Sequence, residues 1–218
     1  MKRLLVLLLL ASATSPAMAD DDISKVNGSI HTDAGVHYRD LETVNGAVYL
    51  AAGVQARGVE TVNGSINADD DVQAHAMETV NGAIRGGRRL HVEAGLETVN
   101  GSIFLDDGSH VGGSVATVNG SIGLVGTDVA TDVETVNGDI TIGIGSHVNG
   151  AVRVKKPSFS LSLTPPRKPR IVIGPHAVVT GPLVFERQVT LYVHDSANIG
   201  PVSGASPQHF SSNSAPRE

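Results

Sequence analysis

The stretch ETVNGSI stands at Glu60–Ile66 and again at Glu97–Ile103, and close copies of it recur along the chain. The asparagine of this phrase returns every 18 or 19 residues, at Asn27, Asn45, Asn63, Asn81, Asn100, Asn119 and Asn137. Self-similarity at a fixed period near 20 residues is the signature of stacked repeats, in which each unit buries its apolar side only against its neighbours. The period therefore predicts a solenoid.

Apolar residues within one unit follow the alternation of short strands. In the unit that begins at Glu42, the residues Val44, Val48 and Leu50 alternate with polar ones, and Val54 follows after a glycine. Alternation with period two indicates half-buried strands. No stretch sustains the three-to-four-residue spacing of an amphipathic helix over three turns. We expect strands and turns throughout the repeats.

Two all-β folds fit such a pattern. Asn-Gly between β-branched residues is a strong hairpin signal and would suit an antiparallel meander. A meander needs only its turn residues to recur, whereas here the threonine before Asn-Gly and the isoleucine or valine after it recur as well. In a parallel β-helix, equivalent residues stack about 4.8 Å apart and identical side chains form ladders. We therefore predict an all-β parallel β-helix (solenoid) of about 18-residue coils. We favour the right-handed form, because each coil carries one motif and not three.

Alternation through the motif assigns its residues to the inside or the outside of the coil. If one strand runs from Thr61 to Ile66, then Val62, Gly64 and Ile66 face inward and Thr61, Asn63 and Ser65 face outward. The alternative for Asn63 is a left-handed corner, a conformation that asparagine tolerates. The threonines and asparagines would then form two outward columns on a flat polar face. This candidate binding face consists of Thr43, Thr61, Thr79, Thr98, Thr117, Thr135, Asn45, Asn63, Asn81, Asn100, Asn119 and Asn137. The same ladders could equally serve stability alone, since threonine favours strands and asparagine ladders stabilise stacked coils.

The chain divides into five segments by composition. Residues 1–19 read as a signal peptide, with a basic start, an apolar run and a small-x-small cleavage site. The β-helix repeat array is expected over 20–154, with an interruption near Asn149, where an eighth Val-Asn-Gly follows after only 12 residues. A proline-rich basic loop is expected over 155–170, C-terminal coils or a cap over 171–205, and a flexible tail over 206–218.

Composition limits the compartment and the partners. The 218 residues carry a formal net charge of −6 and include no cysteine. An acidic chain is a poor binder of nucleic acid or anionic lipid, so we expect no nucleic-acid partner. The apolar run in the signal peptide is too short to span a membrane, and no span is expected after cleavage. We predict an exported protein, periplasmic or secreted.

The repeats contain no recognisable catalytic or metal-binding constellation. Nine histidines are present, but none shows an HExxH pattern or a close paired spacing, and no cysteine joins them. The acidic residues recur within repeats or turns, and no carboxylate pair stands apart as glycoside hydrolysis would require. We predict no catalytic residue, no metal ligand and no cofactor, and therefore no enzyme.

The repeated T-V-N-G-[SAD]-I phrases, over roughly residues 23 to 154, resemble a bacterial adhesin β-repeat family of unknown function. The segment from Ile171 to Gly200, with its IG-x-x-A-x-V-x-G pattern, resembles a polymer-forming bactofilin repeat. These resemblances imply a right-handed β-helix with structural or adhesive duties, and neither brings a catalytic residue to this chain. Bactofilins are typically cytoplasmic, so the signal peptide is a departure from that pattern.

Three functions follow as hypotheses. The first is a non-enzymatic structural or adhesive β-helix of the bacterial cell envelope, which self-associates or binds an envelope polysaccharide or protein. The second is a binding module that uses the flat Thr/Asn face for a periodic ligand, such as a polysaccharide or ice. The third is a carbohydrate-active enzyme.

Overall fold

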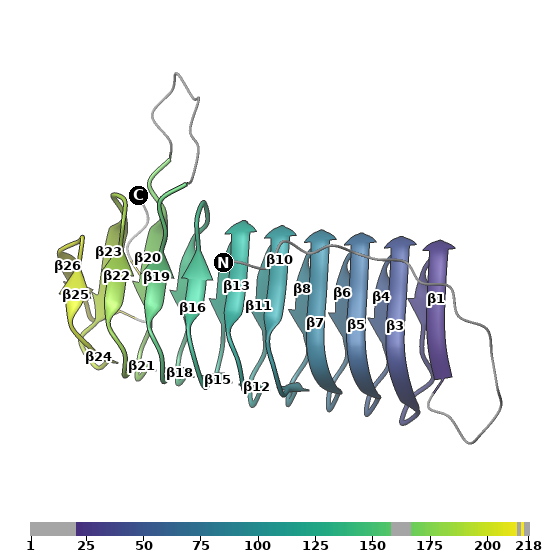
Figure 1. Ribbon diagram of the computed structural model, residues 1–218. Coiled ribbons are helices and arrows are strands. Elements are labelled where there is room, and N and C mark those ends of the chain that lie inside the picture. The colour runs from purple at the N-terminus through teal and green to yellow at the C-terminus, as the bar shows by residue number, and fades with distance from the viewer. Residues whose placement is uncertain (1–20, 158–166, 213–214, 216–218) are drawn as a thin grey trace.

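The computed structural model describes residues 21–157, 167–212 and 215, and in this part of the chain every regular element is a β-strand. The strands form two parallel sheets that face each other in a β-solenoid of ten coils (Figure 1). The long strands run upward on the near side while the chain advances to the left, so the coils wind right-handed (Figure 1). The predicted all-β parallel β-helix is confirmed. Residues 1–19, the predicted signal peptide, lie outside the described residues.

The larger sheet has 16 strands and forms the broad side of the solenoid. Its first four coils each contribute one long strand: β1 (Asp21–Asn27), β3 (His37–Asn45), β5 (Gln55–Asn63) and β7 (Gln73–Asn81). Each later coil contributes two short strands: β9 (His91–Val92) and β10 (Leu96–Asn100), β12 (His110–Val111) and β13 (Val115–Asn119), β15 (Asp128–Val129) and β16 (Val133–Thr135), β18 (His147–Val148) and β19 (Val152–Val154), β21 (Val178–Val179) and β22 (Leu183–Phe185), and β24 (Asn198–Ile199) and β25 (Val202–Ser203).

The smaller sheet has ten strands, one from each coil. They are β2 (Ile30–His31), β4 (Val48–Leu50), β6 (Ile66–Ala68), β8 (Ile84–Gly86), β11 (Ile103–Leu105), β14 (Ile122–Leu124), β17 (Ile140–Ile142), β20 (Arg170–Ile173), β23 (Thr190–His194) and β26 (Pro207–Phe210). Each strand pairs in parallel with its equivalents in the adjacent coils.

A single inserted residue explains the change from long to split strands. In β7, two residues separate the inward-facing Ala74 and Met77, and the strand passes round the bend without a break. In the next coil, three residues separate the inward-facing Val92 and Leu96, and the chain makes a turn between β9 and β10. The extra residue also lengthens that coil, which accounts for the spacing of 19 between Asn81 and Asn100.

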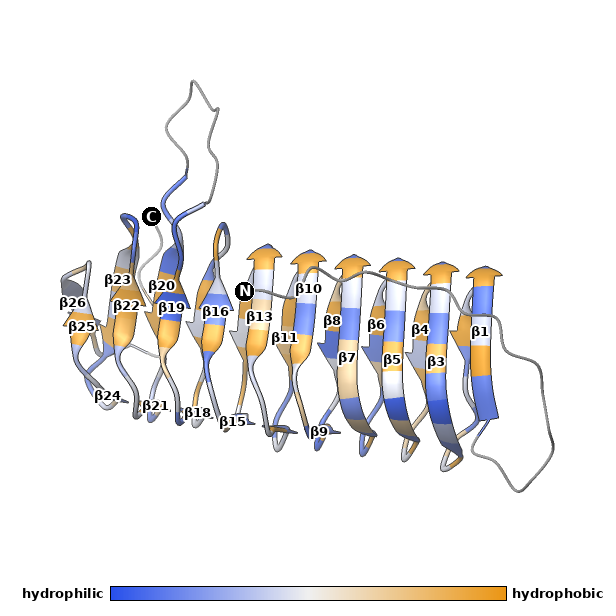
Figure 2. Cartoon of the chain, in the orientation of Figure 1, coloured by the Kyte–Doolittle hydropathy of each residue, from blue (hydrophilic) through white to orange (hydrophobic). Residues whose placement is uncertain are grey.

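The core is a narrow interior filled by stacked side chains of similar size. One register position of the smaller sheet is isoleucine or valine in eight successive coils, all fully buried: Ile30, Val48, Ile66, Ile84, Ile103, Ile122, Ile140 and Ile171. Full burial of such a side chain contributes about 1.5–3 kcal/mol, and each coil adds several of them. Figure 2 shows that apolar and polar positions alternate along the strands. The interior is therefore sufficient to stabilise the stack without disulfides.

The stack is not interrupted at Asn149, and that expectation is wrong. The strands β18 and β19, on either side of Asn149, pair in register with the coil before and the coil after. Asn149 lies at the corner between the two short strands of the larger sheet, whereas the other motif asparagines lie at the corner that leads to the smaller sheet. The eighth Val-Asn-Gly is thus a different corner of the same coil.

The proline-rich excursion is inserted at the corner that Asn-Gly occupies in the earlier coils. It leaves after β19 and returns at β20, whose residues pair with β17 as any next coil would. Asp139 fixes the returning chain, since its carboxylate accepts hydrogen bonds from the Arg167 guanidinium (2.8 Å) and from the Arg170 backbone N–H (2.8 Å). Residues 158–166 of the excursion lie outside the described residues.

The expectation of a flexible tail over 206–218 is wrong for its first residues. Residues Pro207–Phe210 form β26, which pairs with β23 and closes the smaller sheet. Phe210 is buried beside Val172 and Tyr192, in a small apolar cluster on the outer side of that sheet. Burial of Phe210 stabilises the strand Pro207–Phe210, although the polar composition of this segment predicted a flexible terminus.

Candidate functional site: the face of the repeated motif

The threonines of the motif face the interior, and their predicted outward orientation is wrong. Thr43, Thr61, Thr79, Thr98, Thr117 and Thr135 are all at most 5% exposed. The prediction assumed that inward and outward residues alternate without a break from Ile66 back to Thr61. The chain turns at the Asn-Gly corner between them, so the inward residues before the corner are not those that Ile66 implies. Within β5 itself the alternation starts from the buried Val59, which places Thr61 inside and Val62 outside.

Five of the six buried motif threonines donate a hydrogen bond to a specific acceptor in the preceding coil, and Thr135 is the exception. The hydroxyl of Thr61 donates to the carbonyl oxygen of Gly46 at 2.9 Å, and that of Thr79 donates to Gly64 at 2.9 Å. The same bond recurs from Thr43, Thr98 and Thr117. A buried hydroxyl without a partner costs about 1–3 kcal/mol, so this bond is what lets threonine occupy a core position. The threonine column therefore serves the stack and offers nothing to a ligand.

The glycine of the motif is required by the close approach of adjacent coils. A Cβ atom at Gly64 would lie 1.8 Å from the carbonyl oxygen of Gly46, and one at Gly82 would lie 1.8 Å from that of Gly64. No side chain tolerates such a contact with backbone. Glycine at this corner thus follows from stacking, and it exposes the carbonyl that the next threonine binds.

The motif asparagines lie exposed at the corner that leads to the smaller sheet and form a continuous ladder. The amide of Asn63 donates to the side-chain oxygen of Asn45 at 2.9 Å, and equivalent bonds of 2.8–3.0 Å join all seven residues from Asn27 to Asn137. The last oxygen, on Asn137, accepts a hydrogen bond from the guanidinium of Arg187, two coils further on. Each interior asparagine thus uses one N–H donor and one acceptor position of its amide within the ladder.

A column of valines lies next to the asparagines on the outer surface. Its exposed or half-exposed members are Val26, Val44, Val62, Val80, Val99 and Val118. Two of them are well exposed, at 55% for Val26 and 40% for Val99. The column appears in Figure 2 as the orange arrowheads of β1, β3, β5, β7, β10 and β13. These valines contribute nothing to the interior, so core packing does not explain their repetition.

A column of glutamates forms the other border of this valine column. Glu42, Glu60, Glu78 and Glu97 occupy equivalent positions in four adjacent coils. Burial, and then the charges of Glu78, Glu42 and Asp40, raises the pKa of Glu60, while burial and the charge of Glu97 raise the pKa of Glu78. The basic Arg88 and Arg89 do not neutralise the column, because they pair with Asp70 and Asp71 at another corner.

The glutamate column ends in a neutralised position. Glu134 lies further along the same column and contacts both Arg153, at 3.2 Å, and Lys155. Arg153 is itself the next residue in the column. Charge is therefore uneven along this face. The early coils are acidic, and the acidic and basic side chains are paired where the proline-rich excursion leaves the stack. We call the larger, 16-stranded sheet sheet A, and we use the name sheet-A face for its outward Glu, Val and Asn columns together.

Within the described residues, no three side chains of histidine, cysteine, aspartate or glutamate converge in a way that could hold a metal ion. Histidines that are distant in sequence nevertheless stack in one column, and the rings of His91 and His110 lie 5.2 Å apart and nearly parallel. The spacing of the repeats contained this signal, since both histidines stand at the same place in their coils. The described residues also contain no helix long and apolar enough to cross a membrane.

Comparison with protein-family models, with curated proteins and with solved structures found no match. The resemblance to adhesin β-repeats and bactofilins therefore stays a prediction from the motif alone.

Proposed function

We propose that the protein is a non-enzymatic structural or adhesive β-solenoid of the bacterial cell envelope, exported by its N-terminal segment, with the sheet-A face as its contact surface. The observation that carries this proposal is the outward valine column. A repeated residue that faces inward is accounted for by the core, whereas a repeated apolar residue that faces water is typical of a contact surface.

Rigidity supports the same function. The asparagine ladder and the buried threonine bonds fix each coil on its neighbours, and the valines are spaced by the strand separation of about 4.8 Å. A preorganised surface loses little entropy when a partner docks. An extended stack with columns of identical side chains suits a repetitive partner or a second copy better than a single small molecule.

The experiment replaces Val62, Val80 and Val99 together by threonine. Threonine keeps the shape and the strand propensity of valine but removes the apolar methyl contact. The exported chain is sedimented alone, to measure self-association, and with purified bacterial envelopes, to measure adhesion. We expect the triple variant to lose about tenfold in whichever association the parent shows.

The matched control changes exposed aromatic residues on the opposite sheet, Tyr49→Thr with Phe104→Thr. This control should associate as the parent does. The proposal is wrong if the folded parent neither self-associates nor binds envelopes, or if the valine variant associates as well as the parent. The mass of the protein recovered outside the cytoplasm separately tests export and cleavage after Ala19.

A further inference from the structure

A groove runs along the outer surface of the larger sheet where the long strands bend. It has a volume of about 250 Å³ and crosses four coils, from β3 to β9. Two residues, Arg57 and Gly58, lie between the inward-facing Ala56 and Val59, one more than strict alternation allows, and β5 bends there. The groove ends where the inserted residue after β9 replaces the bend by a turn.

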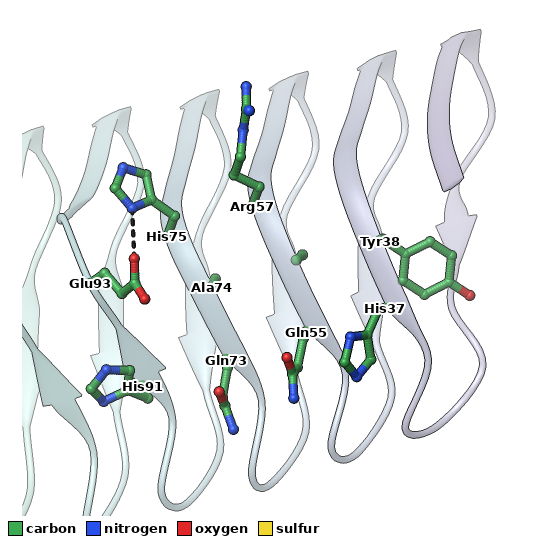
Figure 3. A pocket seen from close by; sticks show the side chains of 10 residues that line it. His37, Tyr38, Gln55, Arg57, Gln73, Ala74, His75, His91 and Glu93 are labelled. Atoms are coloured by element: carbon green, nitrogen blue, oxygen red, sulfur yellow. Dashed lines mark hydrogen bonds and ion pairs between the residues drawn. The ribbon is translucent and has the colours of Figure 1, made fainter. Parts of the chain in front are cut away.

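The two walls of the groove are rows of polar side chains in register. One row consists of His37, Gln55, Gln73 and His91, which are paired neighbours in successive strands. The opposite wall carries Arg57 and the pair His75–Glu93, whose Nδ1 and carboxylate oxygen lie 3.0 Å apart. Figure 3 shows Gln55 and Gln73 side by side on one wall, with Arg57 and His75 on the other. The nearly buried Ala56 and Ala74 form the floor.

The chemistry of these walls is mixed and mostly neutral. Each glutamine amide offers two donors and an acceptor, and each neutral imidazole offers one donor and one acceptor. Adjacent groups in a row are about 4.8 Å apart, so the four coils span about 14 Å. A ligand with many hydroxyl groups, each able to donate and accept a hydrogen bond, complements such a row better than a ligand whose charges all have the same sign.

Other polymers fit the groove less well. A nucleic acid requires several cations along its path, and the lining offers one arginine in a chain of net charge −6. An extended peptide is bound by an open strand edge or by apolar sockets, whereas the strands here are paired on both sides and the apolar lining consists of two alanines and the largely buried Tyr38.

We propose that this groove binds a segment of a linear, hydroxyl-rich polysaccharide, with Gln55 and Gln73 as the central hydrogen-bonding pair. The groove shares no residue with the valine column of the sheet-A face. Glycan binding therefore goes beyond the proposed scaffold function, and either one can fail without the other.

The exported chain is applied to an array of linear neutral and acidic oligosaccharides, and the best-bound oligosaccharide is then titrated in solution by calorimetry. The test variant is Gln55→Ala with Gln73→Ala, which removes two outward-facing amides and leaves the core unchanged. We expect binding to weaken at least tenfold. A second variant, Gln55→Glu with Gln73→Glu, keeps the side-chain size and removes the donors, and it should weaken binding similarly.

The control removes two outward amides from the smaller sheet, Asn67→Ala with Gln208→Ala, and should leave the affinity unchanged. Circular dichroism confirms that each variant is folded. The proposal is overturned if no oligosaccharide on the array binds, if both folded glutamine variants bind as the parent does, or if the control loses as much affinity as they do.

Discussion

The hydroxyl of Thr79 donates a hydrogen bond of 2.9 Å to the carbonyl oxygen of Gly64, which belongs to the preceding coil. The two residues are therefore parts of one device that joins successive copies of the motif. Thr79 supplies a buried donor and Gly64 the acceptor, while the absence of a Cβ at Gly82, three residues after Thr79, leaves room for the Gly64 carbonyl. A net gain of about 1 kcal/mol for each such bond, repeated along the stack, explains why both residues recur.

Replacement of Thr79 by valine should destabilise the solenoid by about 1–2 kcal/mol, because the Gly64 carbonyl loses its donor at nearly constant side-chain volume. The matched control is Thr135→Val. The Thr135 hydroxyl is buried without a hydrogen-bond partner among the described residues, so its removal should raise stability by about 1 kcal/mol. Thermal unfolding followed by circular dichroism distinguishes the two, and equal shifts would contradict this account of the column.

Replacement of Gly82 by alanine should cost about 3 kcal/mol, because the added Cβ would lie 1.8 Å from the Gly64 carbonyl oxygen. Gly123, on the outer side of β14, provides the comparison. Its added Cβ would meet only the Phe104 ring, at 3.2 Å, so Gly123→Ala should change stability by less than about 0.5 kcal/mol. Denaturant midpoints measure both, and a mild effect at Gly82 would show that the coils can separate at this corner.

The glutamate column should make stability depend on pH. The pKa values of Glu60 and Glu78 are raised in the fold, so protonation favours the folded state. Their contribution is fully favourable below about pH 4 and is lost as the pH rises through the raised pKa values. Glutamine mimics the protonated form. Glu60→Gln with Glu78→Gln should therefore raise the melting temperature at pH 7 by about 1–2 °C and leave it nearly unchanged at pH 3.5.

The contrasting variant for that experiment is Glu134→Gln, in the same column. Glu134 contacts Arg153 and Lys155, so loss of its charge should lower the melting temperature at pH 7. If all three glutamates responded in the same direction, position in the column and not local charge would control stability.

Truncation of one ladder asparagine should weaken the stack from the outside. Asn81→Ala removes the bond to Asn63 and the bond from Asn100, and we expect a cost of about 1–2 kcal/mol for the two exposed bonds. Asn67→Ala is the control, since Asn67 faces outward on β6 but does not belong to the ladder. Hydrogen exchange of the backbone in the adjacent coils measures the loss, and equal protection in both variants would assign the ladder no structural role.

Much of the fold could be predicted from the motif because a solenoid is determined by local repetition. The period set the coil length, and the recurrence of threonine and isoleucine around Asn-Gly favoured stacking over hairpins. The asparagine ladder followed from the same reasoning. Each of these features depends only on a residue and its equivalent one coil away, and the sequence lists those equivalents directly.

The sequence alone did not show which motif residues face the interior on each side of the Asn-Gly corner. Alternation is regular from Val59 to Val62, but the chain turns at Asn63 and Gly64. Which residues face inward after this corner therefore does not tell which face inward before it. Thr61 is consequently buried and Val62 faces outward and is half-exposed, the reverse of what Ile66 suggested. A prediction that started from Val59, in the same strand, would have been correct.

The sequence by itself thus determined the parallel stacked architecture, the coil length and the asparagine ladder, because these depend on identity between neighbouring repeats. The tertiary structure alone decided which columns face water, how Arg187 reaches Asn137 two coils away, and how His37, Gln55, Gln73 and His91 line one groove. Those relationships depend on where each corner bends the chain, and one inserted residue, as after Val92, changes a bend into a turn.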